Sequence, residues 1–69
     1  MLSTKLNSTC LTEATYDTDR HDMTLTFAHG GRYKYRDVPE TVYRVLVTAP
    51  SAGRAFHATV RGNYVATRL

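Results

Sequence analysis

The sequence lacks the features that cross-link a small protein, direct its export or anchor it in a membrane. Cys10 is the only cysteine among 69 residues, so no disulfide can form within the chain and a disulfide-rich secreted scaffold is excluded. A free cysteine most often behaves as a small hydrophobic residue, and we expect the same of Cys10. No window approaches the roughly 20 apolar residues of a membrane-spanning helix, and residues 1–11 lack the apolar run of a signal peptide. We therefore expect one small domain that is soluble and cytoplasmic, with no membrane partner.

Motifs of catalysis and of metal or phosphate binding are missing as well. The potential zinc ligands form no CxxC or HxxxH pair and are scattered along the chain: Cys10, His21, His29 and His57. The acid-rich segment 17–22 lacks the glycine and the terminal glutamate of a calcium loop. The glycine-rich stretch 29–32 lacks the GxxxxGK[ST] pattern of a phosphate loop, and no Gly-x-Ser-x-Gly motif occurs. We therefore expect a binding protein that is not an enzyme, with no catalytic residues, no metal and no cofactor.

Acidic residues are absent beyond Glu40, and the two parts of the chain differ in charge. Residues 1–29 carry two basic and four acidic side chains, a net charge of −2, whereas residues 30–69 carry seven basic and two acidic ones, a net charge of +5. A one-sided basic segment is typical of proteins that bind an anionic partner such as nucleic acid, a nucleotide or an acidic protein surface. Basic residues on the surface also keep a protein soluble without any partner, so an anionic partner and simple solubility both remain open interpretations.

Three segments in the first half have the residue pattern of β-strands. β-Branched and aromatic residues are enriched at 11–17, and hydrophobic and polar residues alternate strictly at 23–27. The glycine pair Gly30-Gly31 predicts a hairpin turn into a third strand at 32–36. Tyr33 and Tyr35 lie on one face of this third strand, and three basic residues lie on the other: Arg32, Lys34 and Arg36. Since burying two tyrosines costs less than burying three charges, we expect the tyrosines to pack with the hydrophobic residues of segment 23–27.

Two helices are predicted in the second half, near 39–49 and 52–61. For the first we expect Asp37 as the N-cap and Pro39 near the start. Its apolar stripe has helical spacing and consists of Val42, Val45, Leu46 and Ala49. For the second we expect Ser51 as the cap and Gly62 just beyond the end. Its apolar stripe consists of Ala52, Ala55, Phe56 and Val60. The apolar residues of the tail, 63–69, are expected to dock on the core.

These elements predict an α+β fold, a three-stranded antiparallel meander followed by two short helices packed on one face (β-β-β-α-α). Residues 1–9 lack periodicity and are expected to be a flexible N-terminal arm, with a single domain over 10–69. A chain this short buries only roughly 60% of its unfolded surface, and we expect a monomer or a small homo-oligomer.

The candidate binding site consists of basic residues from the third strand and the second helix: Arg32, Lys34, Arg36, Arg54 and Arg61. Domains that bind single-stranded RNA combine basic side chains for phosphates with aromatic rings for base stacking. RNA or another single-stranded nucleic acid is therefore the leading partner. This hypothesis requires the strand and helix arginines to lie on one continuous surface.

Other interpretations of the same residues remain open. A module that binds a host or cellular protein would show an apolar patch with a charged rim. A protein that sequesters a nucleotide would need a closed pocket. The third possibility is a tyrosine pair in the core with a solvated basic face and no ligand at all.

Several short blocks of the sequence resemble the KTSC domain in order and spacing. The most recognisable are Tyr33-x-Tyr35, Val38-Pro39 and Ser51-x-Gly53-Arg54-x-Phe56, within a resemblance that spans about residues 8–69. Pro50, and His57-Ala58 in place of a polar stretch that commonly contains Asn, depart from the family pattern.

The resemblance implies a fold more firmly than an activity. The KTSC family takes its name from the C-terminal extension of some lysyl-tRNA synthetases and also occurs as small stand-alone proteins of bacteria and their phages. Its function is generally regarded as unknown, and its attachment to a tRNA synthetase suggests RNA binding. A stand-alone copy could instead bind and regulate a host enzyme.

Overall fold

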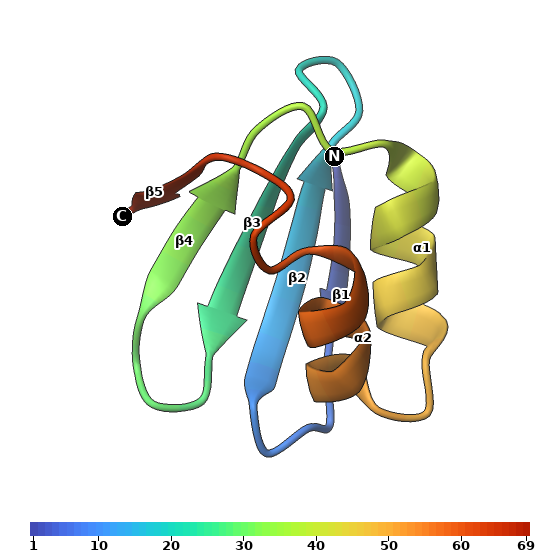
Figure 1. The fold of residues 1–69 in the computed structure, drawn as a ribbon, viewed down its shortest axis with the longest axis vertical. Helices are drawn as coiled ribbons and strands as arrows, with labels where there is room; N and C mark the ends of the chain where they lie inside the picture. The colour runs from blue at the N-terminus through green and yellow to red at the C-terminus, as the bar shows by residue number, and fades with distance from the viewer.

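Five strands form one antiparallel sheet in chain order, and two helices cover one of its faces (Figure 1). The computed structural model describes residues 1–69. The strands are β1 (Leu2–Lys5), β2 (Leu11–Asp17), β3 (Asp22–Phe27), β4 (Arg32–Tyr35) and β5 (Ala66–Arg68). The helices are α1 (Glu40–Thr48) and α2 (Ala52–Thr59), and neither is long and apolar enough to cross a membrane. The α+β class and the order of strands before helices are confirmed, apart from the short β5 at the end.

The sheet has two more strands than the sequence pattern predicts, one at each edge. Residues 1–9, expected to be an arm, contain β1, which pairs with β2 from Leu2↔Tyr16 to Lys5↔Glu13. The tail was expected to dock through apolar side chains, and Tyr64 does pack against the core. Beyond it, β5 pairs with β4 through its backbone, and all the side chains of β5 are exposed. β5 is exposed throughout, and β1 alternates over only four residues in which Leu2 is the single large hydrophobic one, so neither strand gave a clear pattern in the sequence.

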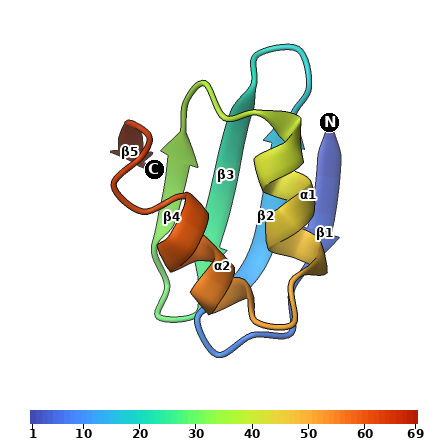
Figure 2. The same cartoon turned by 45° about the vertical axis from the view of Figure 1, so that its right-hand side comes forward.

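The core lies between the helices and the side of the sheet that they cover (Figure 2). Met23 pairs with Tyr35 and Leu25 with Tyr33, so the tyrosines of β4 share a face with the hydrophobic residues of β3, as predicted. Tyr35 is buried and Tyr33 is half-buried. Phe56 of α2 packs edge-on against Phe27 and Tyr35, which fixes this helix over β3 and β4. The other face of the sheet carries no helix.

Helix α1 keeps part of the predicted apolar stripe but is rotated relative to it. Leu46 is buried and Val42 packs against the core, as predicted, whereas Tyr43 is buried and Val45 is 51% exposed. The reason is Tyr43, whose ring packs on Tyr16 and whose hydroxyl lies 2.7 Å from the Thr4 hydroxyl. A tyrosine with a hydrogen-bond partner in β1 rotates the helix away from the valine.

The start of α1 also differs from the prediction. Pro39 occupies the N-cap position and Glu40 is the first helical residue. Asp37 does not cap the helix, because it lies in the loop with a φ of 55°. Aspartate is among the few residues that adopt this left-handed conformation readily, so Asp37 shapes the turn before the helix.

Helix α2 matches its predicted stripe and cap, although it ends at Thr59. Ser51 accepts a hydrogen bond from the backbone N–H of Arg54, and the side chains of Ala52, Phe56 and Val60 are buried. Gly53 faces Cys10 so closely that an added Cβ would lie 3.2 Å from the Cys10 Cβ. The glycine therefore lets the first turn of α2 approach the loop before β2.

Tyr16 joins the two loops at one end of the sheet. Its side chain is 1% exposed, and its hydroxyl donates to the Val38 carbonyl at 2.5 Å and lies 3.2 Å from Nδ1 of His21. The Val38 N–H in turn donates to the His21 carbonyl at 2.9 Å. One buried phenol thus holds the β2–β3 turn against the loop that leads into α1.

Replacement of Tyr35 tests the core. Tyr35→Ala is expected to lower the free energy of unfolding by about 3–5 kcal/mol, because the ring fills the space beneath Phe56. Tyr35→Phe keeps the ring and removes a hydroxyl that makes no hydrogen bond within the protein, so a change below about 1 kcal/mol is expected. Urea unfolding followed by circular dichroism measures both, and equal stability of the alanine variant and the parent would contradict this core.

Alkaline pH tests the buried phenols. Burial raises the pKa of Tyr16 and of Tyr35, so the folded protein keeps protons that the unfolded chain releases above its ordinary pKa of about 10. The stability that the neutral phenols contribute is fully present below about pH 10 and is lost as pH rises through the folded pKa values. We expect the melting temperature to fall from about pH 10 upward, less steeply in Tyr16→Phe. An equally steep fall in variant and parent would exclude Tyr16 as a source.

Candidate nucleic-acid interface

A row of basic side chains follows β4 on the uncovered face of the sheet. Arg32 pairs with Thr26 and Lys34 with Thr24, and these side chains alternate with the tyrosines that face the core. Arg36 follows two residues later and is fully on the surface. The structure therefore brings together three of the five candidate residues, on the side of β4 that the alternation predicts.

Arg20 joins this row from the β2–β3 turn. It lines two shallow hollows of about 390 and 510 Å³, the first beside Arg32 and Lys34 and the second beside Lys34 and Arg36. No sequence pattern marked Arg20, because its place beside β4 depends on how the antiparallel strands align. We call Arg20, Arg32, Lys34 and Arg36 the basic row.

Three carboxylates border the basic row. Asp17 and Asp22 line the first hollow with Arg20 and Arg32, and Asp22 and Asp37 line the second with Lys34 and Arg36. The backbone N–H groups of Arg20 and Asp19, which donate to Oδ1 of Asp17 at 3.1 and 2.9 Å, lower the pKa of the Asp17 carboxyl. Acidic side chains therefore reduce the positive potential in both hollows.

The basic row is free of ion pairs within the protein. The single ion pair joins Arg44 to Glu40 at 2.6 Å within α1. Arg20, Arg32, Lys34 and Arg36 make no contact with a carboxylate oxygen within 4.0 Å. An anion that approaches the row would therefore not have to displace an internal partner.

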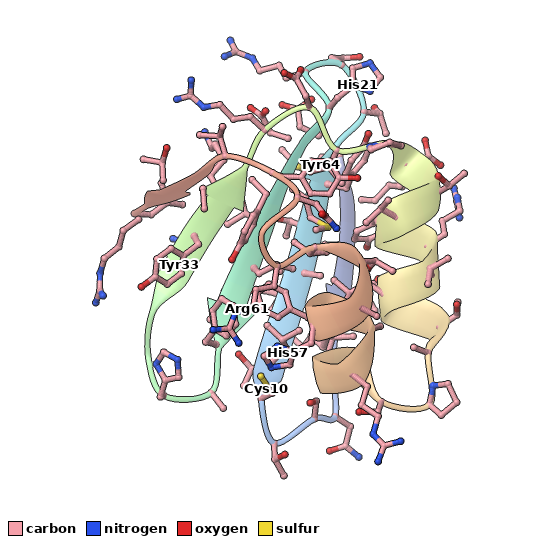
Figure 3. All side chains as sticks on the ribbon, in the orientation of Figure 1. Cys10, His21, Tyr33, His57, Arg61 and Tyr64 are labelled. Carbon is pink, nitrogen blue, oxygen red and sulfur yellow. The ribbon has the colours of Figure 1, made fainter.

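The two helix arginines lie on the other side of the molecule. Arg54 and Arg61 are exposed on α2 and just beyond its end, with His57 between them at helical spacing. Nη1 of Arg61 lies 3.3 Å from Nδ1 of His57, and Figure 3 shows both side chains beside α2. Since the helices cover the opposite face of the sheet, Arg54 and Arg61 do not form one continuous face with the basic row. The expectation of a single surface for all five residues is wrong.

No group of three or more potential ligands gathers at a place that could hold a metal ion. Cys10 is half-buried and packs against the core, next to Gly53 at the start of α2. This position agrees with the expected role of Cys10 as a small hydrophobic residue.

The sequence profile of the KTSC domain matches residues 7–64. The chain belongs to the KTSC family. A crystal structure of the KTSC domain protein YPO2434 from Yersinia pestis superimposes on it with a TM-score of 0.93 at 25% sequence identity, covering 99% of this chain and 96% of that one. The KTSC fold is thus shared over nearly the whole length.

Part of two much longer proteins is also similar to this KTSC chain. A lysine–tRNA ligase of Trichormus variabilis is 36% identical over 52 residues, which are 75% of this chain and 9% of that protein. A lysine–tRNA ligase of Nostoc sp. is 39% identical over 49 residues, which are 71% of this chain and 9% of the ligase. The chain thus spans about a tenth of the length of these curated relatives.

The blocks that resemble the KTSC family have structural roles in this chain. Tyr35 and Val38 are buried, and Pro39 begins α1. Ser51 caps α2, while Phe56 packs into the core. The blocks therefore account for the fold, and the basic row lies between them on the open face.

Loss of charge in the basic row should leave the fold intact. Arg32→Gln/Arg36→Gln changes two exposed side chains without internal ion pairs, and surface substitutions of this kind usually alter stability by no more than about 0.5 kcal/mol each. We expect nearly the same melting temperature as the parent. A large drop would mean that these arginines stabilise the sheet, and the row would then be structural.

Proposed function

We propose that this KTSC domain binds RNA, or another single-stranded nucleic acid, by holding phosphates along the basic row. The observation that carries the proposal is the alignment of Arg32, Lys34 and Arg36 on a sheet face without a helix, where none of them has an internal ion pair. Guanidinium and ammonium groups in a row suit the regularly spaced charges of a nucleic-acid backbone. The proposal is one of binding and involves no catalytic step.

The comparison with lysine–tRNA ligases supports RNA as the partner. Two proteins named for a reaction on tRNA contain a segment similar to this chain. A shared domain is a weaker argument than the geometry of a site, so it serves here only to favour RNA among anionic partners.

The alternative partners have less support. A protein-binding surface would be an apolar patch with a charged rim. Met1 and Leu69 are exposed and line the first hollow among charged side chains, but the other residues that line it are polar or charged. The apolar area there is therefore small, and Val45 is exposed on α1, outside that hollow. The hollows beside the basic row are open to solvent, whereas a protein that sequesters a nucleotide would enclose it.

The dependence of binding on salt tests the proposal. Each neutralised phosphate of a single strand contributes a slope of about −0.7 to log K against log salt. Three contacts, from Arg32, Lys34 and Arg36, would give a slope of about −2, and a fourth from Arg20 would make it steeper. Fluorescence anisotropy with a labelled oligouridylate measures the slope.

A matched pair of variants locates the contacts. Arg32→Gln/Arg36→Gln should weaken binding and reduce the slope by about 1.4, which corresponds to two phosphates. Arg44→Gln/Arg54→Gln removes the same net charge from the two helices, on the opposite side of the sheet, and should leave the slope unchanged. Binding that ignores salt, or that falls equally in both double variants, would contradict phosphate recognition by the basic row.

A further inference from the structure

A cluster of aromatic rings lies between α2 and β4, on the helix-bearing side of the sheet. Phe27 is at its centre, with ring centroids 5.5 Å from His29, 5.6 Å from Tyr33 and 5.3 Å from Phe56. His57 extends the cluster, 5.6 Å from Phe56. Residues from β3, the β3–β4 hairpin, β4 and α2 thus form one group of rings.

The cluster has a rigid base and exposed upper rings. Phe27 and Phe56 are only 9% and 7% exposed, so packing with the core holds them in place. His29 and His57 are exposed and Tyr33 is half-buried. Exposed rings supported by immobile ones lose little side-chain entropy when a flat ligand settles on them.

Gly31 makes room for two of these rings. A Cβ at this position would lie 3.1 Å from Cε1 of Tyr33 and 3.6 Å from Cε1 of His29. The glycine therefore allows the tyrosine ring to lie against the hairpin backbone, next to the histidine. This is a structural reason for the second glycine of the Gly30-Gly31 turn, whose first glycine has a φ of 107°.

Two arginines border the rings. Arg61 contacts His57, and Arg68 places its guanidinium 5.7 Å from the centroid of Tyr33 while donating to the Tyr33 hydroxyl at 3.2 Å. Neither has an ion pair with a carboxylate. Residues 23–36 and 41–69, which include every residue of the cluster, contain no Asp or Glu. We call His29, Tyr33, His57, Arg61 and Arg68 the α2–β4 surface.

We propose that the α2–β4 surface stacks unpaired nucleobases, with Arg61 and Arg68 at the adjoining phosphates. This inference rests on the proposed function and gives the bases of the same ligand a place. Aromatic rings beside unpaired cations are the combination that single-stranded nucleic acid requires, and stacking of this kind tolerates any base. The surface lines none of the hollows, and an open platform suits a strand better than a free nucleotide.

The position of β4 connects this surface with the basic row. Arg32 and Lys34 project from one face of β4 and Tyr33 projects from the other. Only the three-residue β5 separates β4 from the edge of the sheet, and Arg68 of β5 lies on the side of Tyr33. β4 and β5 form this edge of the sheet (Figure 1). A strand of nucleic acid that passed around it would meet phosphate ligands on one face and rings on the other.

The test compares an oligouridylate with an abasic oligonucleotide of the same length, which keeps every phosphate and lacks the bases. We expect the parent protein to bind the oligouridylate about tenfold more tightly, which is the contribution of one stacked base at the low end of the usual range. His29→Ala/His57→Ala should remove most of this difference by weakening the oligouridylate alone. Thr18→Ala/Thr41→Ala, which changes two exposed residues outside both surfaces, should preserve it.

The outcomes separate this inference from the proposed function. Equal affinity of the parent for the two oligonucleotides, with a salt slope still present, would overturn base stacking and leave phosphate binding intact. Base stacking would also be overturned if the histidine double variant lost affinity for both oligonucleotides equally, since the rings would then make no contact with the bases. Failure of both oligonucleotides to bind at low salt would overturn the two proposals together.

Discussion

The register of β4 against β3 is the constraint on which both candidate surfaces depend. Met23↔Tyr35 and Leu25↔Tyr33 place the two tyrosines of β4 under the helices, and the same pairing sends Arg32 and Lys34 to the uncovered face. A slip by one residue would exchange the two sets, because side chains alternate with a period of two. It would bury two charges and expose two rings, so the energy of the core and the position of the basic row are set by the same hydrogen bonds.

Aromatic side chains make the directional contacts between the helices and this sheet. Phe56 packs on Phe27 and Tyr35 beneath α2, and Tyr43 packs on Tyr16 beneath α1. Tyr16 also donates to the Val38 carbonyl, which ties the entry of α1 to the far end of the sheet. In a domain this small, a few large rings supply burial and orientation at once, since each also has a directional contact. The remaining face of the sheet is consequently free for polar side chains.

Electrostatics divide the molecule in a way that the net charge of +3 does not show. The basic row is bordered by Asp17, Asp22 and Asp37, whereas segments 23–36 and 41–69, which form the α2–β4 surface, contain no acidic residue. Phosphate recognition along the row and base stacking on the rings are therefore different physical tasks on different faces. Their shared boundary is β4, and a ligand with both phosphates and bases is the class of molecule that can use the two together.

Local patterns in the sequence were sufficient for the middle of the sheet and for α2. Alternation predicted β3 and β4, the lower cost of burying tyrosines than charges predicted the burial of Tyr35, and the serine before α2 predicted its cap, because these properties depend on neighbours a few residues away. The edge strands β1 and β5 were not predicted, since they are short and pair with residues far along the chain. The face of α1 was predicted only in part for a similar reason: the hydroxyl of Tyr43 meets Thr4, a contact 39 residues apart.

The candidate site shows the same division between local and long-range causes. The sequence determined that Arg32 and Lys34 project together, because they lie two residues apart in one strand, and Arg36 continues the same period just beyond it. Only the tertiary structure decided that Arg20 joins them and that Arg54 and Arg61 do not, since this depends on which face of the sheet the helices cover. The meeting of His29, Tyr33 and His57 around Phe27 and Phe56 likewise exists only in the folded chain. The periodicity of a sequence predicts the faces of a single helix or strand, whereas a binding surface forms where several elements pack together.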